Sequence, residues 1–150
     1  VGKNTVLSDN PELTVRLAKG KNPVRIVVGK SDDFPAEFNI FNDKAKTIFL
    51  SDIDDRPLTV DHILTQLHDK DIISVLVEGG AEVLQQFIDS DTWNEAHVIT
   101  SDKTIEELSA TDNPQKYIKA PEIHGEHLNS IQSENDTIQL IKNPNVLFNT

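Results

Sequence analysis

The residues best suited to chemistry are a carboxylate and two glycines, Glu78-Gly79-Gly80, between an apolar run and an amphipathic stretch. Paired glycines let a backbone approach a ligand closely, and the free N–H groups at the start of a helix favour a phosphate. The stretch is neither a dinucleotide-binding G-x-G-x-x-G sequence nor a P-loop. It predicts either a phosphate cradle or a tight strand-to-helix turn that needs positive φ angles.

Glu78 closes a segment that is apolar over residues 75–77. A carboxylate at the end of such a segment costs desolvation free energy unless it meets hydrogen-bond donors. One interpretation is that Glu78 accepts hydrogen bonds from a polar ring or a ribose. The other is that Glu78 is an exposed strand-end residue that caps the helix following it.

A second group of polar residues lies in the opening stretch VGKNTVLSDNPELTVR, residues 1–16. The pattern predicts the end of a strand at Val1-Gly2, followed by a loop that holds something charged. Arg16 offers a planar fork of donors that suits a phosphate. The alternatives are a surface ion pair for Arg16 and a turn at Asp9-Asn10-Pro11 that Asp9 only caps.

The net charge is −11, and it is unevenly distributed. The first 30 residues hold six basic and two acidic side chains, whereas the remaining 120 hold 8 basic and 23 acidic ones. An acidic chain lacks the positive footprint of a nucleic-acid-binding protein. A small basic region on an acidic body suits a phosphorylated small molecule, although chance variation on a surface gives the same pattern.

Composition excludes several other classes of site. The chain has no cysteine, which rules out disulfides, cysteine–zinc sites and thiol nucleophiles within it. No apolar run has the length of a membrane span, so the sequence predicts a cytoplasmic protein without a membrane partner. His124 and His127 form the one close histidine pair, and their spacing on a polar loop does not predict a metal site. No catalytic triad is predicted either.

Strands are predicted where β-branched runs end in glycine or polar residues, and helices where apolar residues recur at helical spacing. The predicted helices begin after Thr59, a favourable N-cap, and after Gly80. The remaining assignments are strands at residues 23–29, 46–51, 72–80 and 95–100, a loop at 101–128, an antiparallel hairpin of 128–133 and 136–142, and a short last strand at 145–149.

The alternation of strands and helices over the first two-thirds of the chain predicts right-handed βαβ units and a mainly parallel sheet. The C-terminal hairpin makes this sheet mixed. The length of 150 residues suits one domain. Ligands of open α/β sheets bind at the carboxyl ends of the strands. That rule selects two loops, the one in the opening stretch and the one that follows residues 73–77.

Three motifs resemble those of one family: VGKNTVLSDNPELTVR at residues 1–16, NPVRIVV at 22–28, and VLVEGGAEVLQQF at 75–87, followed by NEAHV at 94–98. They are similar to the reductase domain of the bifunctional riboflavin-biosynthesis deaminase/reductase. The resemblance covers residues 1–98 well, weakens over 99–123 and returns only as a pattern of strands. It implies a dihydrofolate-reductase-like α/β fold, with a mixed, mainly parallel sheet flanked by helices and a C-terminal antiparallel hairpin.

The resemblance also implies an NADPH-dependent oxidoreductase of riboflavin biosynthesis, which reduces 5-amino-6-(5-phosphoribosylamino)uracil to its ribitylamino form. Hydride passes from the nicotinamide to the anomeric carbon of the ribose, opened as an aldehyde or imine. The substrate, a phosphorylated aminopyrimidine, is expected to contact Leu13, Arg16 and Glu78. The family's cofactor contacts fall on Thr5, Asp9, Gly79, Gly80, Ala81, Glu82, Val83, Leu84, Gln85 and Gln86.

One departure from the family concerns the end of the second motif's strand. Gly29-Lys30-Ser31 stands where family members often carry Asp-Ser or Asp-Thr. That position lies near the adenosine ribose in the family. Lys30 or Ser31 is therefore expected to meet the 2′-phosphate and favour NADPH, the alternative being a solvated loop lysine.

The other departure is at the start. The family's reductase domain begins several tens of residues earlier, with a helix and a strand central in the sheet, so residues 1–150 are expected to be a partial reductase domain. We expect a gap or a partner strand beside residues 73–77. The deaminase motifs are absent, and the family implies a homodimer and a deaminase domain on the parent chain. Alternatives are a pterin or folate reductase, which need not keep Arg16, and a non-catalytic nucleotide-binding remnant.

Overall fold

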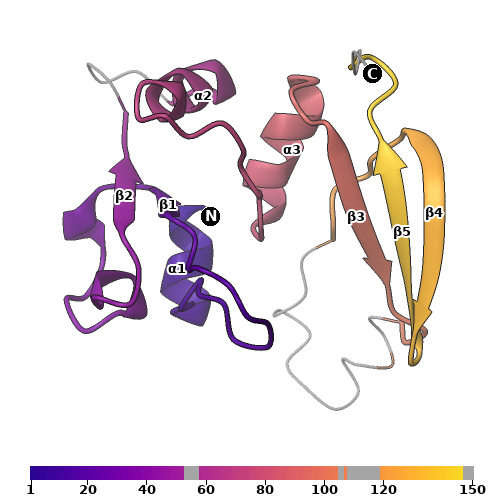
Figure 1. Ribbon diagram of the computed structural model, residues 1–150, viewed down its shortest axis with the longest axis horizontal. Helices are drawn as coiled ribbons and strands as arrows, with labels where there is room; N and C mark the ends of the chain where they lie inside the picture. The colour runs from indigo at the N-terminus through magenta and orange to yellow at the C-terminus, as the bar shows by residue number, and fades with distance from the viewer. Residues whose placement is uncertain (53–57, 105–106, 108–118, 147–150) are drawn as a thin grey trace. The chain divides into compact units, whose positions relative to one another are not determined.

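The computed structural model describes residues 1–52, 58–104, 107 and 119–146 (Figure 1). The chain forms two compact units, Val1–Leu84 and Gln85–Thr150, and each is described by itself. None of the helices in these ranges has the length and apolar character that crossing a bilayer requires.

The first unit contains a small parallel sheet, as the sequence predicts. Strand β1 (Arg25–Val28) pairs in parallel with β2 (Thr47–Leu50). On the other side of β1, Gly2 forms a parallel bridge with Val28, and the Val28 amide donates to the Val1 carbonyl at 2.9 Å. The prediction that a strand ends at Val1-Gly2 is therefore confirmed.

The residues after Gly2 form a helix, α1 (Lys3–Asp9), so the predicted loop is wrong at this point. The sequence KNTVLSD has few strong helix formers, and propensity alone does not predict a helix. The helix is stabilised by tertiary packing, because Val6 is fully buried against Val27, Phe34 and Ile40. It ends at Asn10, whose left-handed φ of 42° lets its amide bond the Val6 carbonyl.

Two short 3₁₀ turns, η1 (Ser31–Asp33) and η2 (Asn39–Phe41), connect β1 to β2. The ring of Phe49 on β2 lies 6.0 Å from Phe34 and 5.6 Å from Phe41, centroid to centroid. These aromatic contacts extend the core of the first unit under the turns. Helix α2 (Val60–His68) confirms the predicted helix, and the Thr59 hydroxyl accepts the His62 amide at 3.3 Å as an N-cap.

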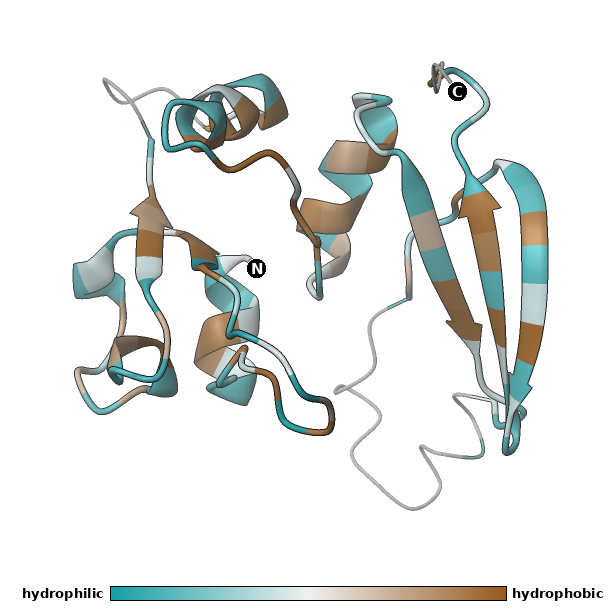
Figure 2. Ribbon diagram, viewed as in Figure 1, coloured by the Kyte–Doolittle hydropathy of each residue, from teal (hydrophilic) through white to brown (hydrophobic). Residues whose placement is uncertain are grey.

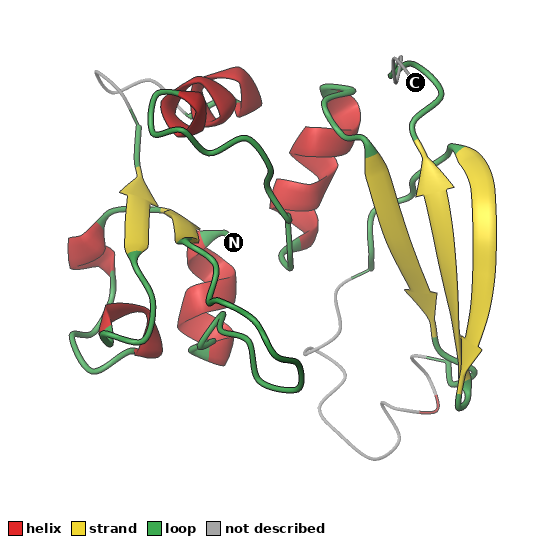
Figure 3. Ribbon diagram, viewed as in Figure 1, coloured by secondary structure: helices red, strands yellow, loops and turns green. Residues whose placement is uncertain are grey.

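Residues 72–80, predicted to be a buried strand, lie in no strand, and that prediction is wrong (Figure 3). The segment is strongly apolar (Figure 2), yet Ile73 is 95% exposed and Leu76 is 79% exposed. β-Branched residues stabilise a strand only when a neighbouring strand supplies backbone partners and covers the side chains. Among the described residues no strand does so for this segment.

Helix α3 (Ala81–Asp89) begins in the first unit and ends in the second, and it confirms the second predicted helix. The second unit holds an antiparallel sheet in which β5 (Asp136–Lys142) lies between β3 (Glu95–Thr100) and β4 (Glu126–Ser133). The predicted hairpin is confirmed, with Ser133 opposite Asp136. Strand β4 starts two residues earlier than expected, inside the predicted 101–128 loop. Residues 105–106 and 108–118 of that loop lie outside the described residues, as do residues 147–149 of the predicted strand 145–149.

The mixed α/β class is confirmed, with one difference in the arrangement of strands. The described strands form a parallel sheet and an antiparallel sheet rather than one continuous sheet. The interruption falls at residues 72–80, where the expected strand has no ladder. Within the second sheet, Ile99, Ile138 and Ile131 stand opposite one another across three strands and form an apolar row.

Candidate functional site

The predicted cofactor residues Thr5, Gly79 and Gly80 lie together in the first unit. Gly79 and Gly80 have φ angles of +66° and +68°, so both adopt the left-handed conformation that favours glycine. A Cβ added at Gly79 would lie 3.1 Å from the Thr5 methyl, and one at Gly80 would lie 3.0 Å from the Thr5 hydroxyl oxygen. The glycines therefore allow a close approach between α1 and the turn before α3.

The helical conformation of residues 3–9 also relates Thr5 to Asp9. Residues four apart lie on the same face of a helix. Asp9 is therefore on the same face of α1 as Thr5, the face that lies against the two glycines. Asp9 is exposed, and no hydrogen bond within the described residues ties it to the turn after α1. The alternative in which Asp9 only caps that turn is therefore not supported, since Asn10 ends the helix.

The first turn of α3 packs closely against the end of the opening strand. A Cβ at Gly2 would lie only 2.8 Å from the Val83 methyl Cγ2. Helix α3 is nine residues long, and the amides of its first turn have no intrahelical partners. Ala81, Glu82, Val83 and Leu84 thus follow the glycines within the first unit, whereas Gln85 and Gln86 belong to the second. Gln85 donates to Asp89 at 2.7 Å on the same helix.

Glu78 is exposed and directly precedes the two glycines. Burial lowers the pKa of the Val1 amino group and the Glu78 carboxylate raises it, which places Glu78 within electrostatic range of Val1. No hydrogen bond joins Glu78 to α3 in the described part of the chain. The Glu78 carboxylate is thus available to a ligand beside Thr5, Gly79 and Gly80, which together are called the cofactor corner below.

The predicted substrate residues Leu13 and Arg16 lie on the loop that follows α1. Leu13 has a φ of 50°, an unusual left-handed conformation for a branched, bulky residue. Arg16 is exposed, and no ion pair within the described residues holds its guanidinium. It does act on Glu12, whose pKa is lowered chiefly by a hydrogen bond from Lys44 and, more weakly, by Arg16.

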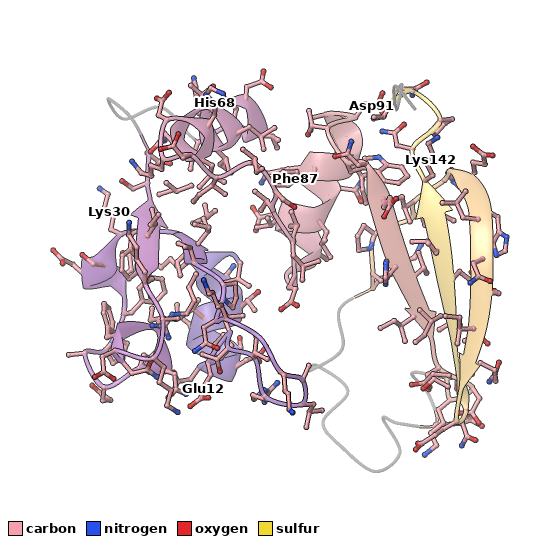
Figure 4. The ribbon with its side chains drawn as sticks, in the orientation of Figure 1. Glu12, Lys30, His68, Phe87, Asp91 and Lys142 are labelled. Atoms are coloured by element: carbon pink, nitrogen blue, oxygen red, sulfur yellow. The ribbon has the colours of Figure 1, made fainter. Side chains whose placement is uncertain are left out.

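Lys30 and Ser31 lie at the end of β1 among acidic groups, which the sequence analysis did not anticipate. The Asp33 carboxylate accepts the Lys30 amide at 2.9 Å and pairs with the Lys3 ammonium at 3.0 Å. The Ser31 hydroxyl donates to Asp32 at 3.0 Å. The Lys30 side chain is exposed (Figure 4). A phosphate here would meet two lysines and two carboxylates.

Sequence reasoning missed Arg25, which donates a hydrogen bond to the Glu12 carbonyl in the loop carrying Leu13 and Arg16. It is only 2% exposed and donates to carbonyl and side-chain oxygens of the surrounding turns. The available signal was its place in PVRIVVG, two residues before Val27 on the same face of a buried strand. Among the described residues no three metal-ligating side chains come together.

Comparison with models of known protein families shows which family this chain belongs to. Residues 1–116 match the model of a family described as the RibD C-terminal domain. The chain belongs to this family. The match includes α1, β1 and the Glu78-Gly79-Gly80 turn, so the resemblance found in the three motifs is confirmed.

Several relatives of this RibD domain family are known. The chain is 36% identical over 109 residues to a 2,5-diamino-6-ribosylamino-4(3H)-pyrimidinone 5′-phosphate reductase of Aquifex aeolicus, covering 59% of this chain and 49% of that protein. It is 39% identical over 92 residues to the riboflavin biosynthesis protein RibD of Mycobacterium tuberculosis, covering 59% of this chain and 25% of that protein. The chain thus spans about half the length of these relatives or less.

Solved structures of RibD proteins share the fold. A deaminase/5-amino-6-(5-phosphoribosylamino)uracil reductase of Thermotoga maritima superposes with a TM-score of 0.71 at 27% identity, over 95% of this chain and 44% of that one. RibD of Acinetobacter baumannii gives a TM-score of 0.72 at 17% identity, over 94% of this chain and 45% of that one. The reductase-domain fold implied by the resemblance is confirmed.

Proposed function

We propose that this chain is the reductase domain of a riboflavin-biosynthesis enzyme, an oxidoreductase that reduces 5-amino-6-(5-phosphoribosylamino)uracil to its ribitylamino form with NADPH. The observation that carries the proposal is the juxtaposition of Thr5 with Gly79 and Gly80, in a chain that belongs to the RibD C-terminal domain family.

The corner formed by Thr5, Gly79 and Gly80 fits a dinucleotide cofactor. The two glycines let Thr5 approach the turn closely, so its side chain lies beside the start of α3, where the free amides and the positive helix end favour a phosphate. Thr5 and Asp9 offer a hydroxyl and a carboxylate on one helix face for ribose or amide groups. When bound, this cofactor supplies a hydride for the anomeric carbon of the opened ribose.

The substrate side of the proposal rests on Leu13, Arg16 and Glu78. The exposed Arg16 guanidinium would bind the ribose phosphate through its fork of donors. Glu78, beside the cofactor corner, would accept hydrogen bonds from the amino groups of the pyrimidine. The left-handed backbone at Leu13 would set the direction of the loop that leads to Arg16.

A second substrate has support from the relatives. The proteins of Aquifex aeolicus and Methanothermobacter thermautotrophicus are named as reductases of 2,5-diamino-6-ribosylamino-4(3H)-pyrimidinone 5′-phosphate. This compound keeps an amino group where the uracil has an oxygen. The proposed contacts of Arg16 and Glu78 suit either ring, and steady-state kinetics with both compounds would decide between them.

We propose NADPH rather than NADH because Lys30 and Lys3 lie at the end of β1, where the family places the adenosine ribose. Asp32 and Asp33 oppose this preference because their carboxylates repel a phosphate; Asp33 pairs with Lys3 and accepts the Lys30 amide, and Asp32 accepts from Ser31. Titration of the full-length protein with both cofactors tests this part, with Lys30→Ala as the variant. Equal affinity for the two cofactors would remove Lys30 and Ser31 from the site.

The proposal extends to the setting of the enzyme. We propose a deaminase domain on the same polypeptide, since the Thermotoga maritima neighbour carries both names. We further propose that the protein is cytoplasmic and forms a homodimer. The row of Ile99, Ile138 and Ile131 offers an apolar surface for the dimer, since Ile99 is 65% and Ile131 56% exposed. Light scattering of the full-length protein, with Ile131→Ser as a variant, tests the dimer.

Arg16→Ala tests the function itself, with Lys19→Ala as a matched control that removes an exposed cation from the same loop. If Arg16 binds the phosphate, kcat/KM for the substrate should fall several tens-fold, roughly 2 kcal/mol for a charge-assisted contact. The affinity for NADPH should stay unchanged, and Lys19→Ala should match the wild type. A pterin or folate reductase would be insensitive to Arg16→Ala, and loss of NADPH affinity alone would mean that the two ligands are reversed.

A further inference from the structure

Arg25 is a buried cation in the core of the first unit. It opens β1, is 2% exposed, and lies on the same strand face as the fully buried Val27. A buried charge is strongly destabilising unless donors and acceptors satisfy it. No carboxylate pairs with this guanidinium among the described residues, so its burial requires another explanation.

The guanidinium is held by oxygens of three surrounding segments. Nη1 donates to the Glu12 carbonyl at 3.3 Å, the Asn39 carbonyl at 2.8 Å and Asn42 Oδ1 at 3.0 Å. Nη2 donates to the Asn42 carbonyl at 2.7 Å and to the Ala45 carbonyl. The loop after α1 is thereby joined to the η2 turn through one side chain. All of these bonds are made by the two Nη groups, and Nε is buried without a partner.

The bond to Glu12 has a particular place in the loop. The Glu12 carbonyl belongs to the peptide that joins Glu12 to Leu13, and Leu13 has the left-handed φ of 50°. Such a conformation costs a non-glycine residue free energy and persists only where the surroundings hold it. Arg25 therefore holds the Glu12 carbonyl, which lies directly before the strained residue Leu13 and four residues before Arg16.

Other contacts anchor the ends of the same loop, and Arg25 holds the backbone in its middle. Asn39 donates two hydrogen bonds to Asn10, from its backbone N–H to Asn10 Oδ1 at 2.7 Å and from its side-chain Nδ2 to the Asn10 carbonyl at 2.8 Å. The Val15 amide donates to Asn22 Oδ1 at 2.9 Å. Between these anchors the Glu12 side chain pairs with Lys44 at 2.6 Å at the surface, whereas the backbone of Glu12 is held by Arg25 alone among the described residues.

We propose that Arg25 is a positioning residue for substrate binding: its buried guanidinium fixes the Glu12 carbonyl, holds Leu13 in its left-handed conformation and so sets the place of Arg16. This inference rests on the proposed function for the roles of Leu13 and Arg16. Only arginine fits, because a planar fork reaches several carbonyls in different directions at once, whereas a lysine ammonium is a single point charge.

The test compares Arg25→Lys with wild type in the full-length protein, and Lys119→Ala, which removes an exposed ion pair with Glu122, is the control. Arg25→Lys should raise the KM for the phosphorylated substrate about tenfold, the effect of one charge-assisted bond. The KM for NADPH should stay within about twofold. Hydrogen exchange of the amides at residues 12–16 should become at least about tenfold faster while that of Val27 is unchanged.

A substrate KM that stays at the wild-type value, unchanged exchange at residues 12–16, or a parallel rise of both KM values would each overturn the proposal. If the wild-type protein reduces neither pyrimidine, the proposed function fails, and the exchange measurement still decides whether Arg25 orders the loop. If Arg25→Lys does not fold, ribose 5-phosphate added to the wild type decides, because positioning is reciprocal. Its binding should slow exchange of the Arg25 Nη protons, and no change would overturn the inference.

Discussion

Gly79→Ala tests the turn on which the cofactor corner depends. With a φ of +66° the residue is in the left-handed region, where a non-glycine residue costs about 1–2 kcal/mol. Alanine also restricts the unfolded chain, which returns about 0.4–1 kcal/mol. The new Cβ would lie 3.1 Å from the Thr5 methyl, and displacing that side chain from its rotamer adds about 0.5 kcal/mol. The net loss of stability is about 1–1.5 kcal/mol.

Urea unfolding of the full-length protein measures this loss. With a slope of about 2 kcal/mol per molar urea, the midpoint should fall by roughly 0.5 M or more. Gly20→Ala is the matched control, since a Cβ there meets nothing within 4 Å and its φ lies outside the left-handed range. That variant should be neutral or slightly more stable. Calorimetric titration should show weaker NADPH binding for Gly79→Ala only.

A second change separates the backbone contribution from the contact. Thr5→Ser removes the methyl that the new Cβ would meet and keeps the hydroxyl, so the double variant should recover only the part due to the contact, about 0.5 kcal/mol. If Gly79→Ala and Gly20→Ala shift the midpoint equally, the left-handed turn is refuted. If Thr5→Ser recovers nothing in the double variant, the turn stands and the contact between α1 and the glycines is refuted.

Three further predictions concern other parts of the chain. Asn143 is fully buried and donates to Asp91 at 2.8 Å and to the Trp93 carbonyl at 2.9 Å, so Asn143→Ala should cost about 1–3 kcal/mol in urea unfolding; a smaller loss would mean that water replaces it. The Lys44 hydrogen bond lowers the pKa of Glu12, so the pair stabilises the fold above the ordinary carboxyl pKa and loses that contribution as pH falls through the lowered value. In Lys44→Met, an NMR titration should show the Glu12 pKa rising, and an unchanged value would contradict the pairing. If a partner strand covers residues 73–77 in the full-length protein, their amides should exchange slowly there, and fast exchange would rule that strand out.

Local patterns predicted most elements correctly where the pattern and the packing agree. Helix α2 has its Thr59 cap and buries Val60, Ile63 and Leu67 as the spacing indicates. Strand β1 and the C-terminal hairpin follow the same logic. These elements need only neighbours that are close in sequence or a face whose polarity is written in the sequence.

The two wrong assignments depended on distant partners. Residues 3–9 are helical because Val6 packs against Val27, Phe34 and Ile40. No pattern within residues 3–9 reveals these contacts. Residues 72–80 have every local mark of a strand and form none, because a strand exists only with a partner that contributes backbone hydrogen bonds. Propensity describes a preference of the segment, and tertiary contacts decide whether that preference is met.

The sequence by itself determined the identity of the candidate site: the family motifs, the glycines before α3, and the choice of Thr5, Asp9, Arg16 and Glu78, since these depend on residue type and order. Only the tertiary structure decided which of them meet. It brought Thr5 against Gly79 and Gly80, which lie far along the chain, and it placed Arg25, a charged residue in an apolar strand, against the Glu12 carbonyl. Residue chemistry is local and is written in the sequence, whereas proximity is a property of the packed chain, because it depends on contacts between segments far apart.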